Sequence, residues 1–139
     1  MVLSAKLHIE GHQNEQDGIH LLTCEYRFFQ ETDQKGLPTS RVNGGMIHLS
    51  FASLEDNEII QWMMSEDADK NGKILFSGDN NTKPFRTLEF KDARLISFHE
   101  NFVDQSKMVT TLSISARVIN ISGIQYYNSW LGYKPPSGS

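Results

Sequence analysis

Hydrophobic and polar residues alternate along most of this chain with a period of two. The alternation predicts six strands, at residues 2–9, 21–30, 46–51, 73–76, 87–98 and 107–119. The last strand shows it most clearly, because one face is apolar and the other carries Thr111, Ser113, Ser115 and Arg117. Small hydroxyl side chains suit a surface past which another molecule slides, and they are also common on an ordinary solvent-facing strand. The pattern indicates a mainly β fold, a small antiparallel barrel or sandwich.

The alternation slips inside the fifth predicted strand. Leu88 and Phe90 lie on one face, whereas Ala93 falls on the opposite parity. A β-bulge near Lys91-Asp92 adds one residue and restores the pattern.

One helix is predicted over residues 54–65. Ser53 followed by Asp56 three residues later is typical of a capped helix start. The apolar residues of the helix fall at helical spacing: Ile59, Ile60, Trp62, Met63 and Met64. We expect this stripe to pack on the core and the helix to cover one open side or end of the barrel.

A long polar connection separates the second and third predicted strands. It covers residues 31–44, far more than the 2–5 or so residues of an ordinary hairpin. Its glycine, proline and asparagine residues favour turns. The stretch is either a protruding arm that contacts another molecule or an ordinary surface loop, and taken alone it supports both readings equally.

Composition narrows the function classes. The chain has 139 residues, 38% of them hydrophobic and 22% charged, which is typical of one globular domain. A net charge of −4 argues against nucleic acid as a partner. The N-terminus lacks a basic stretch followed by an apolar core, and no apolar run approaches the ~20 residues of a membrane span. We expect cytoplasmic synthesis, no membrane insertion, and any export without a cleaved signal peptide.

Candidate chemistry is sparse. Cys24 is the only cysteine and alternates with Leu22 and Tyr26, which favours a buried structural thiol over a nucleophile. The five histidines show no metal-site spacing, and no nucleophile elbow, phosphate loop or dinucleotide motif occurs. The sequence therefore predicts no enzyme, no catalytic residue, no metal and no cofactor, although folding could still bring two carboxylates together in a polar cleft.

The stretch Asp67-x-Asp69-x-Asn71-Gly72 resembles the start of a calcium-binding loop. Such a loop needs a glutamate at its twelfth position, where this chain has Gly78. A polar turn, with Asn71-Gly72 supplying the bend into the next strand, is the favoured interpretation.

The chain changes character after Gly123. An aromatic run contains Tyr126, Tyr127, Trp130 and Tyr133, and residues 134–139 have the composition of a frayed end. We expect the aromatic side chains to pack on this subunit or on a neighbour. The predicted division is a barrel domain at residues 1–122 and a C-terminal extension at 123–139.

Nine short pieces, in order along residues 3–120, resemble the tube protein of bacterial type VI secretion systems (Hcp or TssD), especially the group from Bacteroidetes. They are Ala5-Lys6-Leu7-His8-Ile9, Cys24-Glu25-Tyr26-Arg27-Phe28-Phe29-Gln30, Thr32-Asp33 with Gly36-x-Pro38, Gly44-Gly45-Met46-Ile47, Gln61-Trp62-Met63, Gly72-Lys73-Ile74-x-Phe76, Thr87-Leu88-Glu89-Phe90-Lys91, His99-Glu100-x-Phe102 and Thr110-Thr111-Leu112-x-Ile114-Ser115-Ala116.

The resemblance implies hexameric rings that stack into a hollow tube. Its implied partners are a contractile sheath, spike and baseplate proteins, and effector proteins in the lumen. It implies that the strands matching residues 21–30, 46–51, 87–98 and 107–119 line the channel, so that Thr111, Ser113, Ser115 and Arg117 face the lumen. The long loop would contact the adjacent ring through Asp33, Lys35, Gly36, Pro38, Arg41, Asn43 and Gly44.

Two alternatives stay open from sequence. The same fold forms the tubes of phage tails and of phage-like extracellular injection particles. A monomeric β-barrel that binds a small ligand or peptide is the alternative from another class, and it predicts a monomer with an apolar pocket.

Overall fold

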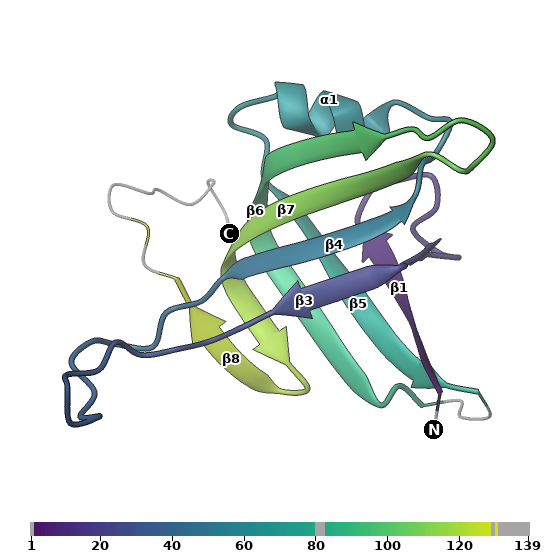
Figure 1. Ribbon diagram of the computed structural model, residues 1–139. Coiled ribbons are helices and arrows are strands. Elements are labelled where there is room, and N and C mark those ends of the chain that lie inside the picture. The colour runs from purple at the N-terminus through teal and green to yellow at the C-terminus, as the bar shows by residue number, and fades with distance from the viewer. Residues whose placement is uncertain (1, 80–82, 129, 131–139) are drawn as a thin grey trace.

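One antiparallel sheet, curled into a half-barrel, and one helix make up the part of the chain that this computed structural model describes, residues 2–79, 83–128 and 130 (Figure 1). The elements are β1 (Leu3–Ile9), β2 (Ile19–His20), β3 (Thr23–Tyr26), β4 (Met46–Ala52), α1 (Glu58–Met64), β5 (Lys70–Gly78), β6 (Arg86–Asn101), β7 (Val109–Ile121) and β8 (Ile124–Tyr127). The strand order is β2-β1-β5-β6-β7-β4-β3, and β8 pairs with β7. The predicted fold class is confirmed.

The β6–β7 hairpin lies in the middle of the sheet, between β5 and β4. Its pairing runs from Leu88↔Ile121 to Asn101↔Val109. The alternation predicted for β7 is confirmed: Leu112 and Ile114 are fully buried, whereas Thr111 is exposed on the other face.

The bulge predicted in β6 is also confirmed. Lys91 and Asp92 together stand opposite the single residue Asn71 of β5, so β6 carries one extra residue there. The Asp92 N–H donates to the Asn71 side chain (2.9 Å), and Asp92 has φ +51°. A second extra residue in β6 lies between Leu95 and Ser97, opposite β7.

The single strand predicted at residues 21–30 is wrong. The chain forms β2 and the short β3, with Leu21 and Leu22 between them. The Leu21 N–H donates to Ala5 of β1 and the Leu22 N–H to Ser50 of β4. This crossing joins the two ends of the curled sheet, which alternation alone does not reveal. The strand predicted at residues 73–76 is also longer than expected, because β5 covers Lys70–Gly78.

The predicted helix start is wrong as well. The Ser53 N–H donates to the Met108 carbonyl and its hydroxyl pairs with that of Thr110 (2.6 Å), so Ser53 extends the sheet instead of capping a helix. Helix α1 begins at Glu58, whose N–H donates to the Asp56 carboxylate (3.0 Å).

Helix α1 covers one end of the curled sheet (Figure 1), and its buried residues join the core of the sheet. Ile59 and Trp62 of α1 are buried, and the Trp62 indole N–H donates to the Ala68 carbonyl (3.0 Å). Met64 does not join the predicted stripe, since it is 75% exposed. Residues of the sheet that are fully buried are Leu7, Ile47, Ile74, Leu88, Phe90, Ala93, Leu112, Ile114 and Ala116.

Candidate assembly surfaces

The long connection between β3 and β4, residues 31–44, projects away from the sheet as a narrow arm (Figure 1). Two isolated bridges, Phe29↔Asn43 and Thr32↔Pro38, pair its two sides. At the tip, Asp33 Oδ1 accepts the N–H groups of Lys35 (2.8 Å) and Leu37 (2.9 Å). The arm therefore has a defined turn, and we call residues 31–44 the extended loop.

The loop residues singled out from sequence fall into two groups. Asp33, Gly36, Pro38 and Asn43 shape the backbone through turn bonds, a bridge or, for Gly36, a φ of +90°. Gly44 packs closely on Phe28, because a Cβ there would lie 2.4 Å from the Phe28 ring. The side chains of Lys35 and Arg41 are instead exposed. A contact made by the loop would therefore use these two cations and the apolar side chains beside them, Leu37 and Val42.

The C-terminal strand braces the base of the extended loop. The Tyr126 ring lies 5.1 Å from that of Phe28, and its hydroxyl donates to the Val42 carbonyl (3.3 Å). The Asn128 side-chain amide donates to the Gly44 carbonyl (3.2 Å). Trp130 also contacts this subunit, since its ring centroid lies 6.0 Å from the guanidinium carbon of Arg94, whereas Tyr127 is exposed. Tyr126 and Trp130 of the aromatic run thus pack on this subunit, while Tyr133 and residues 134–139 lie outside the described residues.

Gly45 allows this brace to form. Its φ is +100°, and a Cβ there would lie 2.5 Å from the Asn128 side-chain nitrogen. Because side chains rarely adopt this backbone conformation, glycine is required at the point where the loop enters β4.

The face of the sheet turned away from the core carries rows of small polar side chains across β3, β4, β7 and β6. One row reads Glu25, His48, Ser113 and Ser97 by strand register. The His48 Nδ1 and the Ser113 hydroxyl lie 2.8 Å apart, and the hydroxyls of Thr23 and Ser50 lie 2.6 Å apart in a neighbouring row. We call this surface the outward face.

All four residues predicted to face a lumen lie on the outward face: Thr111, Ser113, Ser115 and Arg117. Arg117 donates to Asp92 (2.8 Å), and Arg94 of β6 donates to Asp69 (2.9 Å). A carboxylate beside each of the two guanidinium groups compensates its charge, and the rest of the described rows combines hydroxyl groups with Glu25 and His48.

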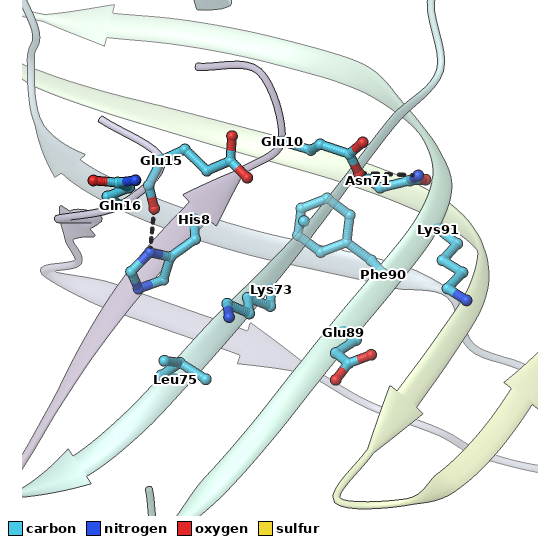
Figure 2. A pocket seen from close by; sticks show the side chains of 11 residues that line it. His8, Glu10, Glu15, Gln16, Asn71, Lys73, Leu75, Glu89, Phe90 and Lys91 are labelled. Atoms are coloured by element: carbon cyan, nitrogen blue, oxygen red, sulfur yellow. Dashed lines mark hydrogen bonds between the residues drawn. The ribbon is translucent and has the colours of Figure 1, made fainter. Parts of the chain in front are cut away.

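A polar depression of about 640 Å³ lies over β1, β5 and β6 (Figure 2). The His8 ring nitrogen Nδ1 bonds to the Glu15 carbonyl (2.5 Å), and the Asn71 amide donates to Glu10 (3.3 Å). Charged side chains of both signs line it: Glu10, Glu15, Lys73, Glu89 and Lys91. This lining differs from the apolar pocket expected of a small-ligand barrel.

Comparison with known proteins decides the family. The profile of hemolysin coregulated protein Hcp (TssD) matches residues 1–131. The chain belongs to the Hcp (TssD) family. The match continues beyond residue 120, where the sequence resemblance ends. No curated protein sequence matches the chain.

Solved Hcp structures share the fold. Hcp1 from Flavobacterium johnsoniae is 28% identical, with a TM-score of 0.81 over 90% of this chain and 99% of that one. Hcp1 from Salmonella typhimurium is 12% identical, with a TM-score of 0.70 over 91% of this chain and 92% of that one. A sheath/tube terminator of an extracellular contractile injection system is 15% identical, with a TM-score of 0.56 over 84% and 91%. The last two likenesses are likenesses of fold.

Hcp proteins form a family of structural tube proteins. In the described part of this Hcp chain, no helix has the length and apolar character needed to cross a bilayer. Cys24 is half-buried beside the core, and burial raises the pKa of its thiol to about 11, which suits the structural role predicted for it.

Sequence reasoning missed one cluster in this Hcp chain. Buried His12, in the connection between β1 and β2, has its Nε2 3.1 Å from a Glu58 oxygen and 3.4 Å from an Asp56 oxygen. Gln13 donates to the same two carboxylates. These residues join the β1–β2 connection to the start of α1 across more than 40 positions, a separation that no local motif reveals.

One hydrogen bond fixes the ring tautomer of the buried His12. The Asn14 N–H donates to Nδ1 (3.0 Å), so the ring proton sits on Nε2, between the carboxylates. A metal would need the Nε2 lone pair, so this arrangement favours a proton there. Burial acts to raise the pKa of Asp56, but hydrogen bonds from the Glu58 N–H and Gln13, with His12 nearby, outweigh it and lower that pKa.

The stretch that resembles a calcium loop is mostly strand. Asp69 is paired with Arg94, and Asn71 and Gly72 lie inside β5. The predicted bend at Asn71-Gly72 is therefore wrong, and the chain turns earlier, where the Ala68 N–H donates to the Ser65 carbonyl. Gly72 is needed for packing, because a Cβ there would lie 2.5 Å from the Phe90 ring.

Proposed function

We propose that this chain is a structural subunit of the inner tube of a type VI contractile injection machine. In this proposal six copies form a ring, rings stack into a hollow tube, and the protein catalyses no reaction. The observation that carries the proposal is the outward face of an Hcp-family sheet. It is broad and carries many hydroxyl groups, and its Arg94 and Arg117 are paired with carboxylates.

The outward face supplies the lumen. Strands β3, β4, β7 and β6 are consecutive neighbours in the sheet, so their outer surfaces form one continuous wall. Thr111, Ser113, Ser115 and Arg117 of β7 would face the channel, where effector proteins travel. Hydroxyl groups exchange hydrogen bonds readily with water and with a passing protein, which keeps adhesion weak.

Ring formation would protect the open edges of the sheet. Strand β3 has β4 on one side only, which leaves a row of backbone N–H and C=O groups for another chain. A closed ring of identical subunits removes such edges by symmetry. In this proposal residues 1–122 form the tube domain, and the extension at 123–139 braces the extended loop through its first strand.

The remaining partners follow from the assignment. A contractile sheath would surround the tube, and spike and baseplate proteins would cap it. Assembly would take place in the cytoplasm, and the tube would leave the cell by ejection. One alternative is a tube subunit of an extracellular contractile injection particle. The fold shared with a sheath/tube terminator of such a particle is the observation behind this alternative.

Electron microscopy of the purified protein tests the proposal. We expect rings with a central hole, and stacks of them at high concentration. Arg41→Glu should leave the ring intact and block stacking, whereas the matched control Lys83→Glu, at an exposed position outside the loop, should stack normally. Gly36→Trp should act like Arg41→Glu, but it also strains a residue with φ +90°. Rings of Arg41→Glu that stack into tubes of ordinary length would refute the role of the loop.

A further inference from the structure

The extended loop joins the sheet through an interrupted pair of stems. Strand pairing between β3 and β4 stops at Tyr26↔Ile47, and the two stems pair again at the isolated bridge Phe29↔Asn43. Residues 27–28 lie between these pairs on the first stem and residues 44–46 on the second, so the second stem carries one extra residue. The loop thus leaves the sheet across a break in the ladder, and the ladder alone does not fix its direction.

Two adjacent glycines, Gly44 and Gly45, lie within this break. Glycine adopts a wider range of backbone conformations than other residues, so this pair would act as a hinge if nothing held it. The carbonyl groups of both glycines have partners outside β3. Gly45 accepts the Ala116 N–H of β7 (2.8 Å), and Gly44 accepts the Asn128 side-chain amide (3.2 Å). The hinge is therefore held by β7 and by the segment that follows β8.

Tyr126 of β8 holds both stems of the loop. Its ring lies 5.1 Å from the Phe28 ring in the first stem, and its hydroxyl donates to the Val42 carbonyl in the second (3.3 Å). The Phe28 ring in turn lies 6.5 Å from the Tyr26 ring in an edge-to-face arrangement, and both side chains pack against the core. A series of aromatic rings thus connects the loop stems to the core, and Tyr126 is its last member.

The sheet fixes the positions of these two C-terminal residues. Tyr126 pairs with Ile119 of β7, and the Asn128 N–H donates to the Arg117 carbonyl of β7 (2.7 Å). In Figure 1, β8 accordingly lies beside the place where the loop leaves the sheet. The C-terminal segment and the sheet therefore form one unit that supports the loop stems.

We propose that Tyr126 and Asn128 are positioning residues of the extended loop: they lock the hinge at Gly44-Gly45 and so set the direction in which the loop leaves the subunit. The lock belongs to the single subunit, whereas its use rests on the proposed tube function, in which the loop has to reach another subunit. A loop with an unlocked hinge samples many directions. A partner that needs one of these directions then binds more weakly, in proportion to the fraction of time that the loop spends in it.

Hydrogen exchange measured by mass spectrometry tests the lock. In Tyr126→Ala/Asn128→Ala we expect peptides covering residues 27–45 to exchange about tenfold faster than in the unaltered protein, while peptides covering β5 keep their rate. The protein concentration is set so that light scattering shows no stacked particles in either sample, because stacking would itself protect the loop. Tyr127→Ala is the matched control, since Tyr127 is 59% exposed and its hydroxyl donates to Gln125 instead of the loop. It should leave the exchange of both regions unchanged.

Two results of this experiment would overturn the inference. Unchanged exchange of residues 27–45 in the double variant would show that the hinge needs no lock, and equally faster exchange in β5 would assign both residues a general stabilising role. Electron microscopy at high concentration gives a second readout: rings of the double variant that no longer stack support the inference, and stacks of ordinary length contradict it. If the unaltered protein stays monomeric, the proposed tube function fails, and the exchange rates still decide whether the lock exists.

Discussion

The two faces of strand β7 differ in burial, although the residues of the two faces alternate along the strand. Leu112 and Ile114 are fully buried, whereas Ser113 between them bonds to His48 across the surface. The buried face holds the subunit together through apolar burial. The outward face adds little to that stability, so its residues are available to serve assembly. Substitutions on the two faces should therefore separate folding from function.

Neighbouring positions on β7 should give the largest contrast. Ile114→Ala removes buried methyl groups and leaves a cavity, so we expect it to lower the free energy of unfolding by about 2–5 kcal/mol. Ser113→Ala removes one surface hydrogen bond and should cost about 1 kcal/mol or less. Urea denaturation followed by circular dichroism measures both. Equal losses of unfolding free energy in the two variants would mean that the outward face also stabilises the folded subunit.

The brace between the C-terminal strand and the loop should show the next largest effect. Gly45→Ala places a side chain at φ +100° and 2.5 Å from the Asn128 amide. We expect a loss of about 1–3 kcal/mol in thermal or urea unfolding. Gly123→Ala is the matched control, because its φ is +98° but a Cβ there would meet nothing within 4 Å. If both variants lose the same stability, backbone strain accounts for the whole loss in Gly45→Ala, and the clash with Asn128 adds nothing to it.

The smallest effect should come from the cluster at the start of α1, and it should depend on pH. The folded state lowers the pKa of Asp56 below its ordinary value of 3.8. Ionised Asp56 therefore stabilises the fold above pH 4, and this contribution is lost as the pH falls through the folded-state pKa. Asp56→Asn should flatten the fall in stability below pH 4, measured by urea unfolding from pH 7 to pH 2.5.

Asp104→Asn provides the control for Asp56→Asn, since Asp104 is exposed in the connection between β6 and β7. It should keep the acid dependence of the unaltered protein. Identical pH profiles for all three proteins would show that the contacts of Asp56 do not stabilise the folded state.

The alternation of hydrophobic and polar residues was enough to predict most features that depend on which side chains are buried. The long strand β7, the bulge at Lys91-Asp92 and the mainly antiparallel fold all follow from which side chains can be buried on one face. The length of the extended loop marked it as unusual, although length alone left a protruding arm and an ordinary surface loop equally open. These are local signals, read within about ten residues.

The errors share one physical cause, which is pairing between distant segments. Ser53 has the chemistry of a helix cap, but its N–H and its hydroxyl are already hydrogen-bonded to Met108 and Thr110. Leu21 and Leu22 continue an apolar alternation, but they bridge β1 and β4. The brace of the loop by Tyr126 and Asn128 joins positions 84 apart in the chain, and no periodicity reports such a contact.

Assembly is the central claim, and the mass of the purified, unaltered protein in solution tests it most directly. Size-exclusion chromatography with light scattering should give a particle of six times the 15.8 kDa chain mass, or a multiple of that ring. A particle of 15.8 kDa that persists at high concentration would contradict the claim.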